Sequence, residues 1–133
     1  MLKNKGFTLI ELIVVVAIIG VVSGIVVTFI TAHKNNAEDS AVKAQIRQIA
    51  AQAQEYYIDN GSHNNMCNIG LGADPVIKAA LDQVSFHSVS YLCYAINQNW
   101  AVSAVLKGGG TWCEDNSNFL GSGTADLSAT CVP

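Results

Sequence analysis

A single carboxylate stands at the start of a long apolar stretch near the N-terminus. Glu11 follows the basic residues Lys3 and Lys5, and no ionisable side chain occurs from residue 12 to residue 32. A helix over this stretch would be about 30 Å long, which is enough to cross the hydrocarbon core of a bilayer. Inserting a carboxylate there costs on the order of 2–3 kcal/mol, so we expect Glu11 to have a partner or a task.

The segment KGFTLIEL, from Lys5 to Leu12, resembles the processing and assembly motif of type IV pilins and the related pseudopilins. The resemblance implies that a prepilin peptidase cuts between Gly6 and Phe7, and that the new amine of Phe7 is methylated. It also implies that Glu11 is needed for assembly. The expected partner of Glu11 is the free amine of Phe7 in a neighbouring subunit, because pairing relieves the cost of two charges in low dielectric.

Two other kinds of N-terminal segment are alternatives. A secretory signal would have an apolar core of about 7–15 residues followed by a small-residue cleavage site, whereas this apolar stretch is longer and no such site follows it. A plain membrane anchor explains the hydrophobicity and the basic flank, but not Glu11 or the Gly6-Phe7 pair. The close match to pilins covers residues 3 to 32.

Gly20 and Gly24 form a G-x-x-x-G pattern within the apolar stretch. Small residues let helices approach closely in lipid, and glycine also weakens a helix by about 1 kcal/mol relative to alanine. Both residues are therefore candidates for helix packing or for local loosening of the helix. Many type IV pilins have a proline near the position of Thr28, and this chain has none in the apolar stretch.

Four cysteines follow the apolar stretch: Cys67, Cys93, Cys113 and Cys131. An even number in an exported domain indicates disulfides, and no pair has the C-x-x-C spacing of a zinc or redox site. Three pairings are possible, and we favour Cys67 with Cys93 and Cys113 with Cys131. The second pair would close the C-terminal segment onto the domain, as a C-terminal disulfide loop does in many pilins.

The sequence gives little support for catalysis or for a cofactor. No Ser/His/Asp set lies on a recognisable motif. The glycines at 108–110 lie between strand-like segments and lack the Lys-Ser or Lys-Thr of a phosphate loop. The Asn60-Gly61-Ser62 sequence matches a glycosylation site, but it fits a helix cap better.

Metal and nucleic-acid binding are also not expected. His33, His63 and His87 are far apart in the sequence, and we expect them at the surface or beside the membrane. The acidic and amide residues at 115–118 lack the glycine and glutamate of a calcium loop. With a formal net charge of −3 and scattered basic residues, the chain has no electrostatic footprint for nucleic acid.

The helix is expected to continue beyond the membrane. No proline or glycine occurs from 33 to 58, and apolar residues recur there at steps of three and four: Val42, Ile46, Ile49 and Ala53. Gly61 then predicts the end of the helix as a left-handed cap. The result is one helix of about fifty residues, apolar all round in its first half and amphipathic in its second half.

Shorter elements are predicted after this helix. A loop over 62–73 leads to a helix from Pro75 to about Val84, with Asp74 as its N-cap. Three segments of period two follow, at 88–97, 99–107 and 111–114, and their short connections indicate antiparallel hairpins. The tail, 115–133, is polar and rich in glycine, and we expect Cys131 to hold it.

These elements predict an α+β protein in which a long N-terminal helix packs on a small antiparallel β-sheet. The expected parts are a leader, 1–6, a membrane-spanning and assembly half of the helix, 7–32, and a head, 33–133. The resemblance implies a structural subunit without cofactor that waits in the cytoplasmic membrane. It would then polymerise with other copies into a surface filament, using the peptidase and an ATP-driven assembly platform. The alternatives are a pseudopilin of a type II secretion system and a membrane-anchored binding module that does not polymerise.

Overall fold

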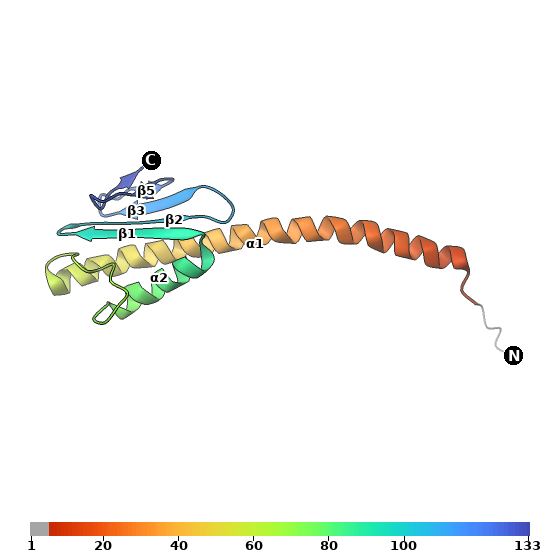
Figure 1. Ribbon diagram of the computed structural model, residues 1–133, viewed down its shortest axis with the longest axis horizontal. Coiled ribbons are helices and arrows are strands. Elements are labelled where there is room, and N and C mark those ends of the chain that lie inside the picture. Colours follow the sequence, from red (N-terminus) through yellow and green to blue (C-terminus); the bar gives the residue numbers. More distant parts are fainter. Residues whose placement is uncertain (1–5) are drawn as a thin grey trace. The chain divides into compact units, whose positions relative to one another are not determined.

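A single long helix, α1, is the largest element of the fold (Figure 1). The computed structural model describes residues 6–133. α1 runs without interruption from Leu9 to Asn60, a length of 52 residues, which confirms the long helix predicted from the sequence. Contacts divide the chain into two units, 1–34 and 35–133, and α1 contributes to both.

The second half of α1 carries the apolar stripe predicted from its periodicity. Val42, Ile46, Ile49 and Ala53 are fully buried and form the centre of the main core cluster. The helix ends at Gly61, whose φ of +71° lies in the left-handed region and whose N–H donates to the carbonyl of Tyr57 at 2.8 Å. This is the predicted glycine cap.

A second helix, α2, spans Pro75–His87 and packs on the same core. The side chain of Asp74 accepts hydrogen bonds from the N–H groups of Val76 and Ile77, both at 2.9 Å, so the predicted N-cap is confirmed. The helix is three residues longer than predicted. It ends where the N–H and the hydroxyl of Ser88 both donate to the carbonyl of Val84.

An antiparallel sheet covers α1 from another side, in the strand order β1-β2-β3-β4 (Figure 1). The strands are β1 (Ser90–Ile96), β2 (Asn99–Val105), β3 (Thr111–Asp115) and β4 (Leu120–Gly121). β1 pairs with β2, and β2 with β3, as antiparallel hairpins, which confirms the prediction from period two.

β2 is buried on both of its faces. Trp100, Val102 and Ala104 point into the main cluster with α1 and α2. Ala101, between them in the sequence, belongs to a second small cluster with Cys113 and Ala125. The central strand is therefore apolar on both sides because each side has its own cover.

The C-terminal tail provides that second cover, and here the sequence prediction was incomplete. Cys131 holds the tail as expected, but the tail also forms β4 and a further two-stranded sheet of β5 (Thr124–Ala125) and β6 (Cys131–Val132), which were not predicted. The N–H of Ala125 donates to the hydroxyl of Ser103 on β2 at 2.9 Å. These strands have only two residues each, too few for a period to be read from the sequence.

Two disulfides fasten the head, and they join the pairs that the sequence analysis favoured. Cys67 is bonded to Cys93, which ties the loop after α1 to β1. Cys113 is bonded to Cys131, which ties β3 to the tail.

The turn between β2 and β3 depends on its glycines. The N–H of Gly108 donates to the carboxylate of Asp39 on α1, and a Cβ at this position would collide with that carboxylate. Gly109 and Gly110 have φ values of +106° and +82°. The turn can therefore approach α1 closely only with glycine at these positions.

The expectation that the histidines lie at the surface is wrong for His63. This residue is only 4% exposed, and its ring stacks on that of Tyr57. Its backbone N–H donates to the backbone carbonyl of Asn97 at 2.6 Å. Hydrogen bonding and stacking draw the loop after α1 against the end of the sheet. Burial lowers the pKa of His63 below its usual value, although the nearby carbonyls of Ala53 and Gln98 oppose the shift.

The stability of the head should therefore decrease as the pH falls from about 7.5 to 5. Because the folded-state pKa of His63 is depressed, the unfolded chain takes up the proton first, below about pH 6.5. His63→Phe should reduce this pH dependence, whereas His33→Phe, at an exposed position, should retain it. Thermal unfolding of the full chain in micelles, followed by circular dichroism, measures both. Equal pH dependence in the two variants would contradict the assignment to His63.

Candidate assembly site

The residues expected to be processed lie directly before α1. Gly6 is exposed, and Phe7 is 84% exposed in a non-helical segment that leads into the first turn. The peptide bond between them is therefore accessible from solvent and is not held in a helix. This is the backbone state that a peptidase needs, because a helical bond must first unfold to enter an active site.

Glu11 makes a reciprocal cap with Thr8 at the start of α1. Its Oε2 accepts hydrogen bonds from the N–H of Thr8 at 2.9 Å and from the hydroxyl of Thr8 at 2.7 Å. The hydroxyl oxygen in turn accepts a longer bond of 3.4 Å from the N–H of Glu11. The T-x-x-E pattern is the capping box of helix N-termini.

Thr8 is a site residue that the sequence analysis missed. The capping-box spacing from 8 to 11 was a sufficient signal, since it needs no tertiary information. Both bonds from Thr8 go to Oε2, and among the described residues none donates to Oε1. Thr8 therefore fixes the carboxylate at the helix end and leaves one oxygen for a partner.

The first half of α1 is exposed along its described length. From Leu9 to Ala32, all side chains whose burial is described are exposed, and this part of α1 is apolar and long enough to cross a membrane. The hydroxyls of Ser23 and Thr31 each donate to the carbonyl four residues earlier within the helix. Such bonding suits a helix in lipid or among other helices.

Gly20 and Gly24 lie in this exposed half, about two to four turns beyond Glu11. α1 remains helical through both, so this structure has no loosening at the glycines. A Cβ added at either position would meet no atom within 4 Å. Packing within the described part of the subunit does not require these glycines, and their role in contacts with other helices stays a prediction.

The cysteines belong to the other unit and are not part of this site. The predicted site residues thus fall into two groups: the processing and assembly group at the start of α1, and the two disulfides of the head. Thr8 and Glu11 are in direct contact, whereas Gly20 and Gly24 lie further along the helix, apart from Glu11.

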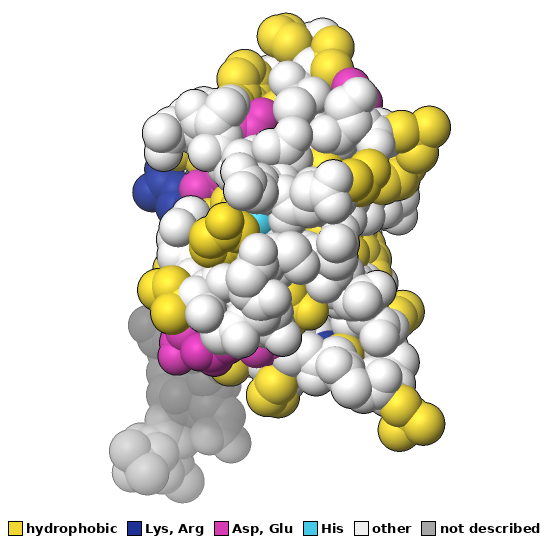
Figure 2. All heavy atoms as spheres, turned by 90° about the vertical axis from the view of Figure 1, so that its left-hand side faces the viewer, with side chains coloured by type: hydrophobic (Ala, Val, Ile, Leu, Met, Phe, Trp, Pro, Cys, Tyr) yellow, Lys and Arg dark blue, Asp and Glu magenta, His cyan; other side chains and the backbone are white. Residues whose placement is uncertain are grey.

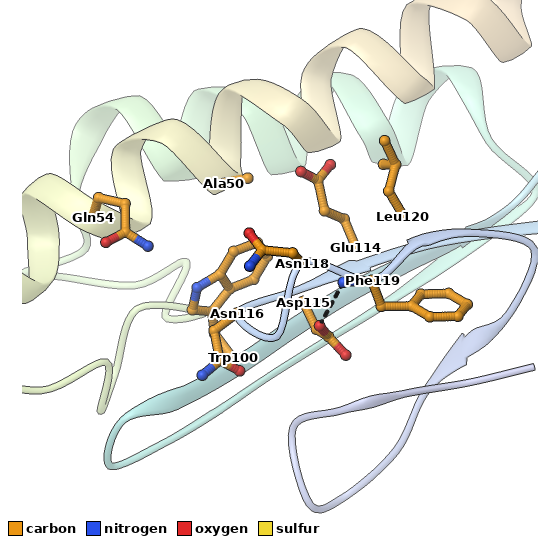
Figure 3. A pocket seen from close by; sticks show the side chains of 9 residues that line it. All are labelled: Ala50, Gln54, Trp100, Glu114, Asp115, Asn116, Asn118, Phe119 and Leu120. Atoms are coloured by element: carbon orange, nitrogen blue, oxygen red, sulfur yellow. Dashed lines mark hydrogen bonds between the residues drawn. The ribbon is translucent and has the colours of Figure 1, made fainter.

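The head contains a polar hollow of about 330 Å³ between α1 and the loop after β3 (Figure 3). Ala50 and Gln54 on α1 face Asn116 and Asn118 of the loop across it, and the indole of Trp100 lies on the β2 side. Burial raises the pKa of Glu114, which also lines the hollow, while the charge of Arg47 opposes the shift. The hollow offers amides and a carboxylate, without a nucleophile beside a base among its lining residues.

Among residues 6–133, no group of three or more His, Cys, Asp or Glu side chains could hold a metal ion. On the face shown in Figure 2, the coloured basic side chains form no broad patch, and hydrophobic side chains lie in small separate groups.

Comparison with known proteins identifies the family of this chain. The family model of the prokaryotic N-terminal methylation motif matches residues 1–27. The type IV wide pilus major component PilA4 of Thermus thermophilus is 32% identical over 114 residues, which cover 84% of this chain and 81% of that protein. The type II secretion system core protein G of Pseudomonas aeruginosa is 38% identical over 58 residues, 44% of this chain and 41% of that protein.

The core protein G of Dickeya chrysanthemi is 32% identical over 71 residues, 53% of this chain and 46% of that protein. No solved structure matches the chain. Of these three relatives, the pilus component is matched over the largest share of the chain, and the methylation motif coincides with the segment that carries Gly6, Phe7 and Glu11. The long helix of this chain, packed on a small antiparallel sheet, agrees with these matches. The chain belongs to the family of type IV pilins and pseudopilins.

Proposed function

We propose that this chain is a structural subunit that polymerises into a type IV pilus-like surface filament. The observation that carries the proposal is the uncovered first half of α1, in which the described side chains are exposed and apolar apart from the capped Glu11 and a few hydroxyls. Such a surface is stable only in a bilayer or against like helices. The helix can leave lipid for a bundle of copies without exposing its apolar side chains to water.

The chemistry at the start of the helix supports assembly in register. Cleavage between Gly6 and Phe7 would create a free amine on Phe7, beside the Thr8–Glu11 cap. The amine of Phe7 in one subunit could then lie against Oε1 of Glu11 in a second subunit. In a low dielectric both charges are costly alone, so their pairing favours one axial position over the others.

The other partners follow from the family. A prepilin peptidase would remove residues 1–6, and an assembly platform with its ATPase would extract the subunit from the cytoplasmic membrane. The mature subunit would then be part of a filament on the cell surface. The role is structural rather than catalytic, in keeping with relatives that are named as pilus and secretion components.

A pseudopilin of a type II secretion system is the second candidate. The matches to two core proteins G favour it, but they cover less than half of each of those proteins. The match to a pilus major component covers 81% of that protein and includes most of the head. The head, rather than the shared N-terminal motif, therefore favours a pilus.

The subunit in assembled filaments is expected to begin at Phe7 with a methylated amine. The reason is that Gly6 and Phe7 lie in an accessible, non-helical segment next to Glu11. Filaments sheared from cells would be seen by negative-stain microscopy and their subunits weighed by top-down mass spectrometry. Intact filaments whose subunits keep Met1 to Gly6 would contradict the processing step, and a lack of filaments would contradict polymerisation.

A further inference from the structure

The hollow between α1 and the loop after β3 contains two buried polar atoms that no described residue satisfies. Trp100 is only 2% exposed, and its indole N–H has no hydrogen-bond partner within residues 6–133. The same is true of Oε2 of Glu114, which is also buried. Figure 3 shows the indole nitrogen on the side of Gln54, which lines the same hollow. Buried polar atoms are nearly always hydrogen-bonded, so a lone donor and a lone acceptor in one hollow indicate a bound molecule.

The size of the hollow suits a small organic ligand rather than a single water. Its volume of about 330 Å³ is roughly tenfold that of one water molecule and lies within the range of small-ligand sites, about 300–1,000 Å³. The side chains of Gln54 and Asn118, which also line it, are exposed. Exposed side chains change rotamer within about nanoseconds, so these two can move aside and admit a ligand to the buried atoms.

A second polar hollow adjoins the first. It has a volume of about 310 Å³, and Gln54 and Asn116 line both hollows. The side-chain amide of Asn116 donates to the backbone carbonyl of Gln98 at 3.1 Å and to Oδ1 of Asn99 at 3.2 Å, which holds it in place. Two hollows of similar size that share one fixed amide suit a ligand made of two linked units.

The charges of the first hollow favour a neutral ligand. Glu114 and Asp115 line it and, among the described residues, no Lys or Arg does, so an anion would meet repulsion. Both oxygens of Asp115 already accept backbone hydrogen bonds, and burial raises the pKa of Glu114, so a cation would find little free charge. Hydroxyl groups can donate to a carboxyl or accept from it, and they match the amides of Gln54 and Asn118 in the same way.

We propose that the two hollows form a binding site for a neutral oligosaccharide, with one sugar unit in each. A hydroxyl oxygen of the first unit accepts from the indole N–H of Trp100, and another hydroxyl pairs with the carboxyl of Glu114. Gln54 and Asn116 contact both units. A peptide is the alternative ligand, but its backbone has one donor and one acceptor per residue and would match fewer of the lining groups than a ring of hydroxyls. All lining residues lie in the unit 35–133, so binding does not require polymerisation.

The two tryptophans of the chain give the test an internal control. The indole N–H of Trp112 is likewise buried without a partner in the described part of the chain, but Trp112 lines neither hollow. The full chain, ¹⁵N-labelled, is placed in micelles of a detergent without a sugar headgroup and titrated with cellobiose, lactose and diacetylchitobiose. At least one of these disaccharides should shift the indole resonance of Trp100 in a saturable way and leave that of Trp112 unchanged. The variant Trp112→Phe assigns the two resonances, and glycerol and tetraserine are the control ligands.

A matched pair of variants tests where the sugar binds. Gln54→Ala should raise the Kd of the disaccharide by about fivefold, as expected when one hydrogen bond to the ligand is lost. Gln83→Ala removes an exposed glutamine from α2, away from both hollows, and should leave the Kd unchanged. Both positions are exposed, so neither variant should change the melting temperature of the chain.

Three results would overturn the inference: no disaccharide shifts the Trp100 resonance, both indole resonances shift alike, or the two glutamine variants bind with equal Kd. A shift with tetraserine but not with the sugars would also overturn it, in favour of a peptide. The measurement uses the isolated chain, so its failure would leave the proposed function standing. A wild-type chain that forms no filaments but binds the sugar would instead overturn the proposed function alone.

Discussion

Filament yield is expected to fall by at least about a hundredfold when Glu11 is replaced by glutamine. Removing one partner of a buried charge pair costs about 3–5 kcal/mol, and each 1.4 kcal/mol corresponds to about a factor of ten. Glutamine can still accept the bonds from Thr8, since the capping box uses either Glu or Gln at this position. The start of α1 and membrane insertion should therefore be unaffected, and only the charge that meets the amine of Phe7 is lost.

Yield should be measured on sheared filaments at equal membrane level of each variant. Glu55→Gln is the matched control, because it makes the same change at an exposed position near the other end of α1. Thr8→Ala separates the cap from the charge and should give an intermediate yield. Normal piliation with Glu11→Gln would show that the charge does not set the register, and would favour an anchor that does not polymerise.

Local signals were sufficient for most of the fold. The length of α1 and its end at Gly61 follow from an apolar stripe without breakers and from one glycine that can adopt positive φ. The start of α2 follows from an Asp-Pro pair in which each residue has its own physical role. The hairpins from β1 to β3 follow from period two and short turns.

The tail and His63 could not be predicted because their structure depends on distant parts of the chain. β5 and β6 exist where the tail meets the outer face of β2, and nothing in a two-residue segment indicates that neighbour. His63 is buried because its loop is drawn to Asn97 and Tyr57, which lie outside that loop in the sequence. A polar loop sequence gives no sign of such contacts.

The predicted assembly site depends on the family resemblance more than on physical reasoning from the residues. The roles of Gly6, Phe7 and Glu11 came from the family resemblance. Physical reasoning alone indicated only that a carboxylate in the apolar stretch is costly and needs a partner or a task. The structure adds Thr8 as the residue that orients this carboxylate.

Asp115 is the residue whose loss should destabilise the head most among those that hold the tail. It is 4% exposed, and its Oδ1 accepts bonds from the N–H and hydroxyl of Ser117 and from the N–H of Phe119 (Figure 3). Its Oδ2 accepts the N–H of Cys131 at 2.8 Å. Burial alone would raise the pKa of Asp115, but these bonds outweigh it and hold the pKa below its usual value.

Asp115→Ala should lower the stability of the head by about 3 kcal/mol, because several donors around the carboxylate lose their acceptor. For a unit of this size that is a decrease of roughly 12–24 °C in Tm. Asp115→Asn should be less severe, since its amide oxygen can replace Oδ1 while its NH₂ faces the N–H of Cys131. Thermal unfolding of the full chain in micelles, with the disulfides intact, gives both values. The stabilisation should persist at neutral pH and be lost only as the pH falls below about 4, through the depressed folded-state pKa.

Asp126→Ala is the matched control for this prediction. Asp126 accepts the same pattern of local bonds, from Ser128 and Thr130, but on an exposed turn of the tail. Its loss should lower Tm much less, because water can replace the missing acceptor there. If the two alanine variants melt at the same temperature, the Asp115 carboxylate does not contribute to holding the tail on the sheet. A large difference would instead show that the tail is fastened at two neighbouring points, by the disulfide and by the carboxylate that accepts the N–H of the same cysteine.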